Sequence, residues 1–236
     1  MDFNFSNLAN TSFTSTAAQR LKPYDIYKVK LTKLEKSELK GSKDPDKVYP
    51  VIAVEFTSVD ENTPGVFSEN IFIPTTQEDM TRRTLTNKEG HDSVMPSRFE
   101  EFQYTLMQIA EVLNPEGAKK IKENGTKIKT IEQFIDLIIK AASTPSAKNK
   151  VTNLKLVGRN NNGTIYASLP RACGLNRNGE IFATNFLGDN LYFSNYEITQ
   201  QKKYRSAAPT PMNDSTPDDK DSTNDINLDD IADDIL

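Results

Sequence analysis

The sequence predicts a mixed α+β domain, mainly β, in which helices are inserted between the third and fourth of five strands. Two observations predict this fold class. Apolar and polar residues alternate in five short runs, and a period of two is typical of half-buried strands. Between the third and fourth runs the apolar spacing changes to three and four residues, which indicates amphipathic helices.

The first three strands are expected at residues 24–34, 48–58 and 66–73. The faces expected to point into the core hold Tyr27, Val29 and Leu31 in the first strand and Ile52, Val54 and Phe56 in the second. A polar loop is expected at residues 36–47, and a turn at 60–65 makes the second and third strands a hairpin. Pro74 ends the third strand, and residues 75–96 are expected to be irregular.

The helical insertion is expected over about residues 97–142. Ser97 and Glu100 fit a capping box at the start of the first helix. Pro115 opens a short second helix and Gly125 closes it. A third helix begins near Thr130, where a second capping box is expected.

After the helices the strand period returns. Strands are expected at residues 151–158 and 164–169, joined by the turn Asn160 to Gly163, which is a strong hairpin signal. A short strand is expected at residues 180–184, and a last one at 190–199. This order of strands and helices is that of an OB-fold, a small barrel that binds oligonucleotides. We therefore expect an OB-like five-stranded barrel over residues 21–205; the alternative is a sandwich with helices on one sheet face.

The two ends of the chain differ from its body. Residues 1–20 are rich in Ser, Thr and Asn, and form either a flexible arm or one that docks on a neighbouring subunit through its phenylalanines. Residues 206–236 are expected to be a disordered acidic tail. From residue 214 onward there are nine aspartates and one lysine, so the rest of the chain holds 28 basic and 24 acidic residues. A basic body with an acidic tail suggests a polyanionic ligand that the tail can mimic.

The strand faces opposite the expected core mix cations with aromatic rings. Candidate DNA-binding residues there are Lys28, Lys30, Tyr49, Phe72, Lys155, Arg159, Tyr166 and Arg171. Single strands are held by cations that track phosphates and by rings that stack on bases, here Tyr49, Phe72 and Tyr166. A second basic group, Lys202, Lys203 and Arg205, either extends this groove or only marks the end of the domain. The alternative is that the lysines are ordinary solvated residues and the tyrosines reflect β-propensity.

The last residues of the tail combine aspartates with aliphatic side chains, which a merely solvating tail does not need. They are Leu228, Asp229, Asp230, Ile231, Asp233, Asp234, Ile235 and Leu236. This end resembles the acidic C-terminal tip of bacterial and phage single-stranded DNA-binding proteins. It departs from the bacterial tip, which commonly ends in proline and phenylalanine, and the helical segment is larger here, so a phage-type protein fits better.

That resemblance implies sequence-independent binding and protection of single-stranded DNA in replication, recombination and repair. It also implies that the tip recruits replication and recombination proteins and competes with DNA for the basic groove. Homo-oligomers are compatible with it. The competing hypothesis is a phage structural or scaffold protein that does not bind DNA.

Enzyme classes are not favoured by the residues present. Cys173 and His91 are the only residues of their kinds, so a disulfide, a zinc site and a histidine-dependent triad lack their parts. No Walker A, GxSxG or GxGxxG motif occurs. A magnesium site of Glu55 with Asp60 or Glu69 is the weaker alternative. We expect no catalytic residue, cofactor or metal. With no apolar run of about 18 residues and no signal peptide, the cytoplasm is expected, the host's if the chain is phage-encoded.

Overall fold

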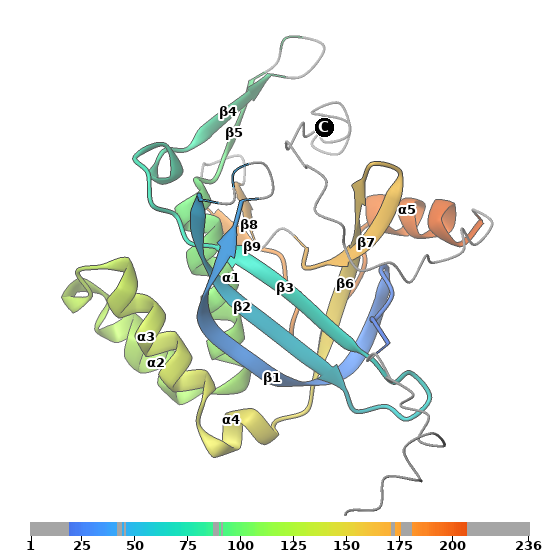
Figure 1. Ribbon diagram of the computed structural model, residues 1–236, viewed down its shortest axis with the longest axis horizontal. Coiled ribbons are helices and arrows are strands. Elements are labelled where there is room, and N and C mark those ends of the chain that lie inside the picture. Colours follow the sequence, from blue (N-terminus) through green and yellow to red (C-terminus); the bar gives the residue numbers. More distant parts are fainter. Residues whose placement is uncertain are drawn as a thin grey trace, which may run out of the picture.

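The centre of the molecule is a five-stranded antiparallel sheet in the order β3-β2-β1-β6-β7 (Figure 1). The computed structural model describes residues 19–41, 44, 46–86, 90, 92–170, 173–175 and 181–206. The strands are β1 (Asp25–Lys40), β2 (Val48–Ser58), β3 (Val66–Phe72), β6 (Thr152–Asn161) and β7 (Thr164–Ser168). The α+β class and the helical insertion between the third and fourth of these strands are confirmed.

Strand β1 is longer than the sequence predicted and serves two neighbours. Its 16 residues include 36–40, which were expected to be loop. Its first residues, 25–29, pair with β6, and residues from Val29 to Lys40 pair with β2. The register shifts between Leu31 and Lys33, as in a β-bulge, which bends a strand and increases its twist. The bend lets one strand cross the sheet, as Figure 1 shows.

The core lies between the sheet and the inserted helices. The helices are α1 (Arg98–Leu113), α2 (Pro115–Glu123), α3 (Ile131–Ala142) and α4 (Pro145–Asn149), with the 3₁₀ turn η3 (Gly125–Lys127) between α2 and α3. The predicted core faces of β1 and β2 are buried in one cluster with residues of α1 and α3. An ion pair of 2.6 Å between Lys36 Nζ and Asp136 Oδ1 also joins β1 to α3. The capping box of Ser97 and Glu100 is confirmed. At Thr130 only half of the expected box forms: Thr130 Oγ1 accepts from Gln133 N, but Gln133 Oε1 accepts from Lys129 N.

Two segments differ from the prediction. Residues 75–96 are not irregular throughout: they contain the 3₁₀ turn η2 (Glu78–Met80) and a hairpin of β4 (Arg83–Thr86) and β5 (Asp92–Met95), which projects from the body (Figure 1). The strand expected at 190–199 is wrong: residues 190–194 form no strand, and α5 (Asn195–Ser206) occupies the second half of that stretch. The short strand expected at 180–184 is confirmed as β9 (Ile181–Ala183), which pairs with β8 (Cys173–Leu175).

In the described residues, the edge strands of the main sheet are β3 and β7. Both edges are contacted by other parts of the chain. The Glu69 carboxylate of β3 accepts hydrogen bonds from Leu169 N (2.8 Å) and Ser168 Oγ (3.1 Å), directly after and at the end of β7. Burial raises the pKa of Glu69, although these two donors and the charge of Arg159 oppose the shift. At the start of β3, Val66 pairs with residues 19–21, so the end of the expected arm belongs to the body.

The rest of the expected arm, residues 1–18, lies outside the described residues. Within the described part of the chain, no helix is long and apolar enough to cross a membrane.

Candidate nucleic-acid interface

The strand register places the predicted cations and rings on the sheet face opposite the core. Lys30 of β1 lies opposite Thr57 of β2. Phe72 of β3 lies opposite Val51 of β2, and Val51 is two residues after Tyr49, so Tyr49 and Phe72 are on the same face. Across the other half of the sheet, Lys28 lies opposite Asn153, and β6 continues by alternation to Lys155 and Arg159. The predicted residues on β1, β2, β3 and β6 therefore lie on one face of the sheet, as their alternation in the sequence predicts.

Tyr49 and Phe72 form a contact between β2 and β3. Their ring centroids are 6.1 Å apart and the ring planes are nearly perpendicular, at 86°, which is the favoured edge-to-face arrangement. Phe72 is 58% exposed, so most of its ring faces water. The ammonium of Lys47 lies 5.0 Å from the centroid of Tyr49, within cation–π range. Contact with Tyr49 raises the pKa of Lys47, so this cation stays charged at neutral pH.

Lys47 was not among the predicted site residues. The sequence assigned it to a polar loop, where lysines are common. It is held near Tyr49 because the loop closes on itself: Gly41 N donates to the Lys47 carbonyl oxygen at 2.7 Å, and Lys47 N donates to the Asp44 carbonyl oxygen at 3.0 Å. Its place two residues before Tyr49 was the available signal, since such residues lie on one side of an extended chain.

A second cluster lies at the β6–β7 hairpin. Arg159 and Tyr166 are directly opposite each other in the register and both are exposed, Tyr166 by 47%. The predicted turn is confirmed: Asn162 and Gly163 both have positive φ, at 50° and 85°, as a type I′ turn requires. The hairpin thus presents a guanidinium beside an aromatic ring next to a tight turn.

The face between these clusters is not a continuous exposed groove. On β2, Val51 is fully buried and Ala53 is 8% exposed, although the sequence placed both on the face opposite the core. On β1, Lys28 is exposed and Lys30 is half-buried. The face therefore holds two cation–aromatic clusters, at Phe72 and at Tyr166, and two lysines of β1. Buried residues of β2 lie between them.

The prediction that Lys155 is an exposed DNA contact is wrong. The side chain has the expected direction, but α5 and the segment before it cover that part of the face. Lys155 is 2% exposed, and its ammonium donates to both Glu197 carboxylate oxygens at 3.1 Å and to the Tyr192 carbonyl oxygen at 3.0 Å. The lysine therefore anchors α5 to β6.

The second basic group lies on α5. Lys202, Lys203 and Arg205 are all exposed there. The helix packs beside the start of β1 through Tyr204, whose ring centroid is 5.7 Å from that of Tyr24, and through Gln201, which donates to the Tyr24 carbonyl oxygen at 2.7 Å. The second basic group therefore lies on an exposed helix and not on a strand.

Several predicted residues fall outside the described part of the chain. These are Arg171 and the tail residues Leu228, Asp229, Asp230, Ile231, Asp233, Asp234, Ile235 and Leu236.

The acidic residues considered for magnesium have separate structural contacts. Glu55 Oε1 accepts from Thr32 Oγ1 at 2.8 Å, Asp60 accepts from the Asn62 backbone N–H at 2.9 Å, and Glu69 joins β3 to the end of β7. Among the described residues, no three carboxylate, histidine or cysteine side chains form a group that could hold a metal.

Comparison with known proteins gave no relative from which a function could be transferred. No protein-family model matches this sequence, and the searches of curated proteins and of solved structures found no significant match.

Proposed function

We propose that this protein binds single-stranded DNA without sequence preference and protects it during replication or recombination. The observation that carries the proposal is the exposed Phe72 ring packed edge-on against Tyr49, with the Lys47 ammonium beside them. An exposed ring stacks on any base, and a neighbouring cation attracts the phosphate that follows the base. The Arg159–Tyr166 pair on the same sheet face repeats this combination.

The arrangement of the strands supports an OB-like barrel as the frame of this site. In OB-folds, oligonucleotides bind on strands two and three and on the loops that join strands one to two and four to five. Tyr49 and Phe72 lie on the second and third strands of this sheet, and Lys47 lies in the loop before β2. Arg159 and Tyr166 flank the turn between β6 and β7, the fourth and fifth strands of this sheet. The contacts of Glu69 with the end of β7 bring the two outer strands together, as a nearly closed barrel requires.

In this proposal the acidic tail recruits replication and recombination proteins. Its aspartates suit a basic rim, and its aliphatic residues suit a hydrophobic pocket in the partner. Where no partner is bound, the tail weakens DNA binding, because a chain of aspartates competes with phosphates for the same cations.

The test measures binding of fluorescent oligo-dT to the full chain by anisotropy, over a series of salt concentrations. Phe72→Ala should weaken binding by about 1–3 kcal/mol, or about 5- to 150-fold, because one base loses its stacking partner. Lys47→Gln should lower the slope of log affinity against log salt by about 0.7, the value for one phosphate contact on a single strand. A chain ending at Ser206 should bind more tightly than the full chain.

Leu137→Ala is the matched control, since Leu137 is 39% exposed but lies on α3, among the helices that pack on the core side of the sheet. It should leave the affinity unchanged. If the full chain and the shortened chain both fail to bind at moderate salt, DNA binding is wrong and a structural role is favoured. If Phe72→Ala has no more effect than Leu137→Ala, the site lies elsewhere.

A further inference from the structure

The helical insertion has a groove of about 290 Å³ between α1, α2 and α3. On α1 the lining residues are Phe99, Gln103 and Met107, which follow one another at intervals of four and so form one stripe. The neighbouring stripe of the helix, which includes Phe102 and Leu106, is buried in the core. Residues of α2, of the segment around η3 and of α3 complete the walls.

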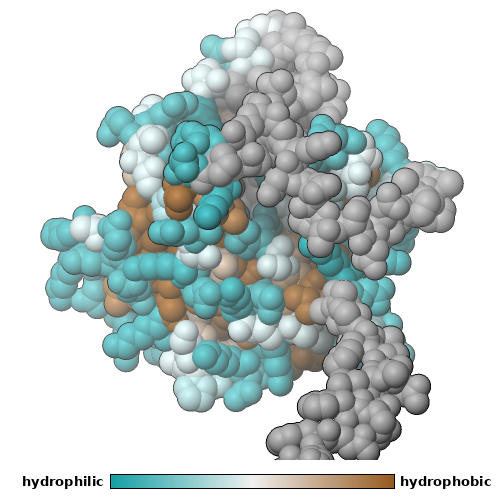
Figure 2. Space-filling view, in the orientation of Figure 1, coloured by the Kyte–Doolittle hydropathy of each residue, from teal (hydrophilic) through white to brown (hydrophobic). Residues whose placement is uncertain are grey.

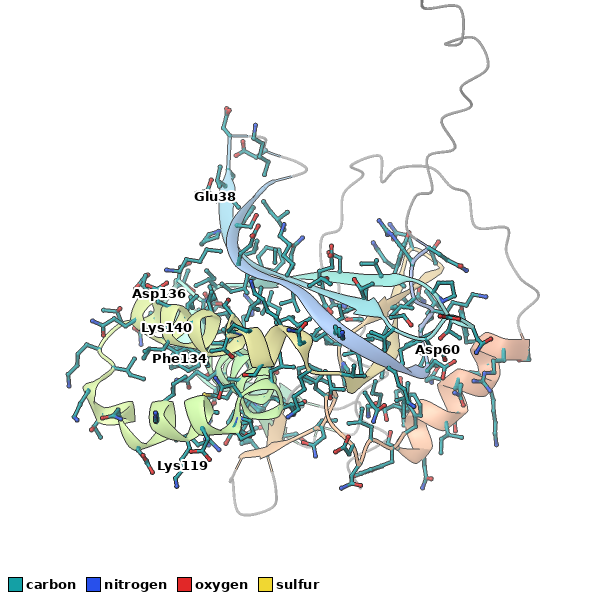
Figure 3. All side chains as sticks on the ribbon, turned by 90° about the horizontal axis from the view of Figure 1, so that it is seen from below. Glu38, Asp60, Lys119, Phe134, Asp136 and Lys140 are labelled. Atoms are coloured by element: carbon teal, nitrogen blue, oxygen red, sulfur yellow. The ribbon has the colours of Figure 1, made fainter. Side chains whose placement is uncertain are left out.

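The floor of the groove is apolar. Its hydrophobic lining residues are Phe99, Met107, Ile121, Ile128, Ile131 and Phe134. Phe134, labelled in Figure 3, is itself 7% exposed and packs edge-on against Phe102 of α1, so the floor is backed by the core and does not collapse. A volume near 290 Å³ is about twice that of a cavity that admits benzene, about 150 Å³. The groove therefore has room for about two aliphatic side chains.

The rim of the groove is basic. Lys122 and Lys129 both line it. Lys122 is paired with Glu111 at 2.6 Å, but Lys129 donates only to the Thr126 carbonyl oxygen at 2.9 Å and has no carboxylate partner within the described residues. Residues 115–130 hold five lysines and two glutamates, a net charge of +3. Figure 2 shows hydrophobic patches among mainly hydrophilic residues on the side where Figure 1 places these helices.

The C-terminal tip of this same chain has the complementary pattern. Leu228, Ile231 and Ile235 are three and four residues apart, so they share one face of a helix, while the four aspartates among them supply negative charge. An amphipathic helix that lays its apolar face into a groove is a common mode of peptide recognition.

The chain after α5 is long enough for the C-terminal tip to reach this groove. Ser206 ends α5, which Figures 1 and 3 show at the end of the molecule opposite α2 and α3. The 22 residues from there to Leu228 span up to about 70 Å when extended, more than the width of a small domain. A linker of this length keeps the tip at an effective concentration of about a millimolar near its own groove.

We propose that the groove between α1, α2 and α3 binds the C-terminal tip of this chain, residues 227–236. Ile231 and one neighbour on the same helix face, Leu228 or Ile235, enter the apolar floor, and the aspartates meet Lys122 and Lys129 at the rim. The tip is then held on the helical layer, away from Phe72 and Arg159, so the aspartates that compete with DNA for the sheet face are the five between residues 214 and 225. A partner protein takes the tip by displacing it from this groove. The contact does not require DNA, so it is independent of the proposed function.

The experiment first follows the methyl NMR signals of Met107, Ile128 and Ile131 in the full chain without DNA. Ile231→Ser should shift these signals, because the tip leaves the groove. Ile226→Ser is the matched control: it removes the same side chain just outside the tip, and should leave the signals in place.

A second measurement uses a fluorescent peptide of residues 227–236. It should bind the full-length Leu228→Ser/Ile231→Ser/Ile235→Ser variant more tightly than the natural chain, whose own tip occupies the groove. In that variant, Lys129→Glu should weaken the peptide about fivefold. Lys127→Glu, which changes the same charge two residues away and outside the groove, should have a smaller effect.

Three results would overturn the proposal. The first is that no groove methyl responds to Ile231→Ser. The second is that the responding signals belong to the sheet face around Phe72, which would put the tip in the DNA-binding surface. The third is that the peptide binds the triple variant no better than the natural chain. Oligo-dT affinity is measured separately, so a failure of DNA binding leaves these three results unaffected.

Discussion

Replacing Lys155 with methionine tests how α5 is held on the sheet. The change keeps a long flexible side chain but removes an ammonium that is 2% exposed and donates to Glu197 and to the Tyr192 carbonyl oxygen. The Glu197 carboxylate, 15% exposed, then keeps the hydrogen bond from Ser194 N at 2.7 Å. Breaking a buried ion pair by removing one partner costs about 3–5 kcal/mol.

We expect a loss near the lower end, about 3 kcal/mol, because some water reaches Glu197. In a protein of this size such a loss lowers Tm by about 6–12 °C, which calorimetry measures directly. Hydrogen exchange should locate the damage: the amides of α5 should exchange faster, while those of β2 should change less. The double change Lys155→Met/Glu197→Leu leaves no unpaired charge, so it should recover most of the stability.

The reasoning is refuted if Lys155→Met lowers the free energy of unfolding by less than about 1 kcal/mol. It is also refuted if the variant loses oligo-dT affinity while the α5 amides stay protected. In that case the ammonium contacts the ligand and not Glu197.

Two further predictions concern the sheet. Gly158→Ala should destabilise the protein by about 1–3 kcal/mol in urea unfolding, because its Cβ would meet the Tyr24 ring and lie 2.6 Å from Ile165 Cγ2, whereas Gly125→Ala, with open space around it, should cost less than about 0.5 kcal/mol. For Glu69→Gln, the direction of the change in stability with pH follows from burial, which raises the pKa of Glu69 in the folded protein above its usual 4.5. The natural carboxyl is therefore most favourable below that value and loses stability as pH rises through the folded pKa. Thermal unfolding should favour the natural chain over Glu69→Gln more at pH 4 than at pH 7.5; the opposite order would show that Arg159 and the hydrogen bonds outweigh burial.

Most of the sheet could be predicted because each strand shows its period locally. Phe56 is buried and Phe72 is exposed, as the alternation in β2 and β3 predicts. Lys155 shows where this reasoning stops. It has the same parity as Arg159, yet one is buried and the other exposed, because burial there is decided by a helix 40 residues away that the strand itself does not reveal.

The sequence does contain a signal for the start of that helix. Ser194 and Glu197 form a capping box: Glu197 N donates to Ser194 Oγ at 3.2 Å, and Ser194 N donates to Glu197 Oε2 at 2.7 Å. The same pattern identified the start of α1 from the sequence. Tyr192 and Phe193 lie directly before Ser194 and favour a strand, so the local signals in this stretch conflict.

The contacts at the edge of β3 have a consequence for self-association. An uncovered edge strand offers unpaired backbone groups to a second chain, and sheets that leave one open tend to grow into aggregates. Here residues 19–21 lie along Val66, and the Glu69 side chain takes the backbone N–H that follows β7. In both contacts the two partners are 45 to 100 residues apart in the sequence, so the contacts form only when the whole domain has folded. We therefore expect the folded chain to be protected from sheet extension, and its partly folded states to be the ones that aggregate.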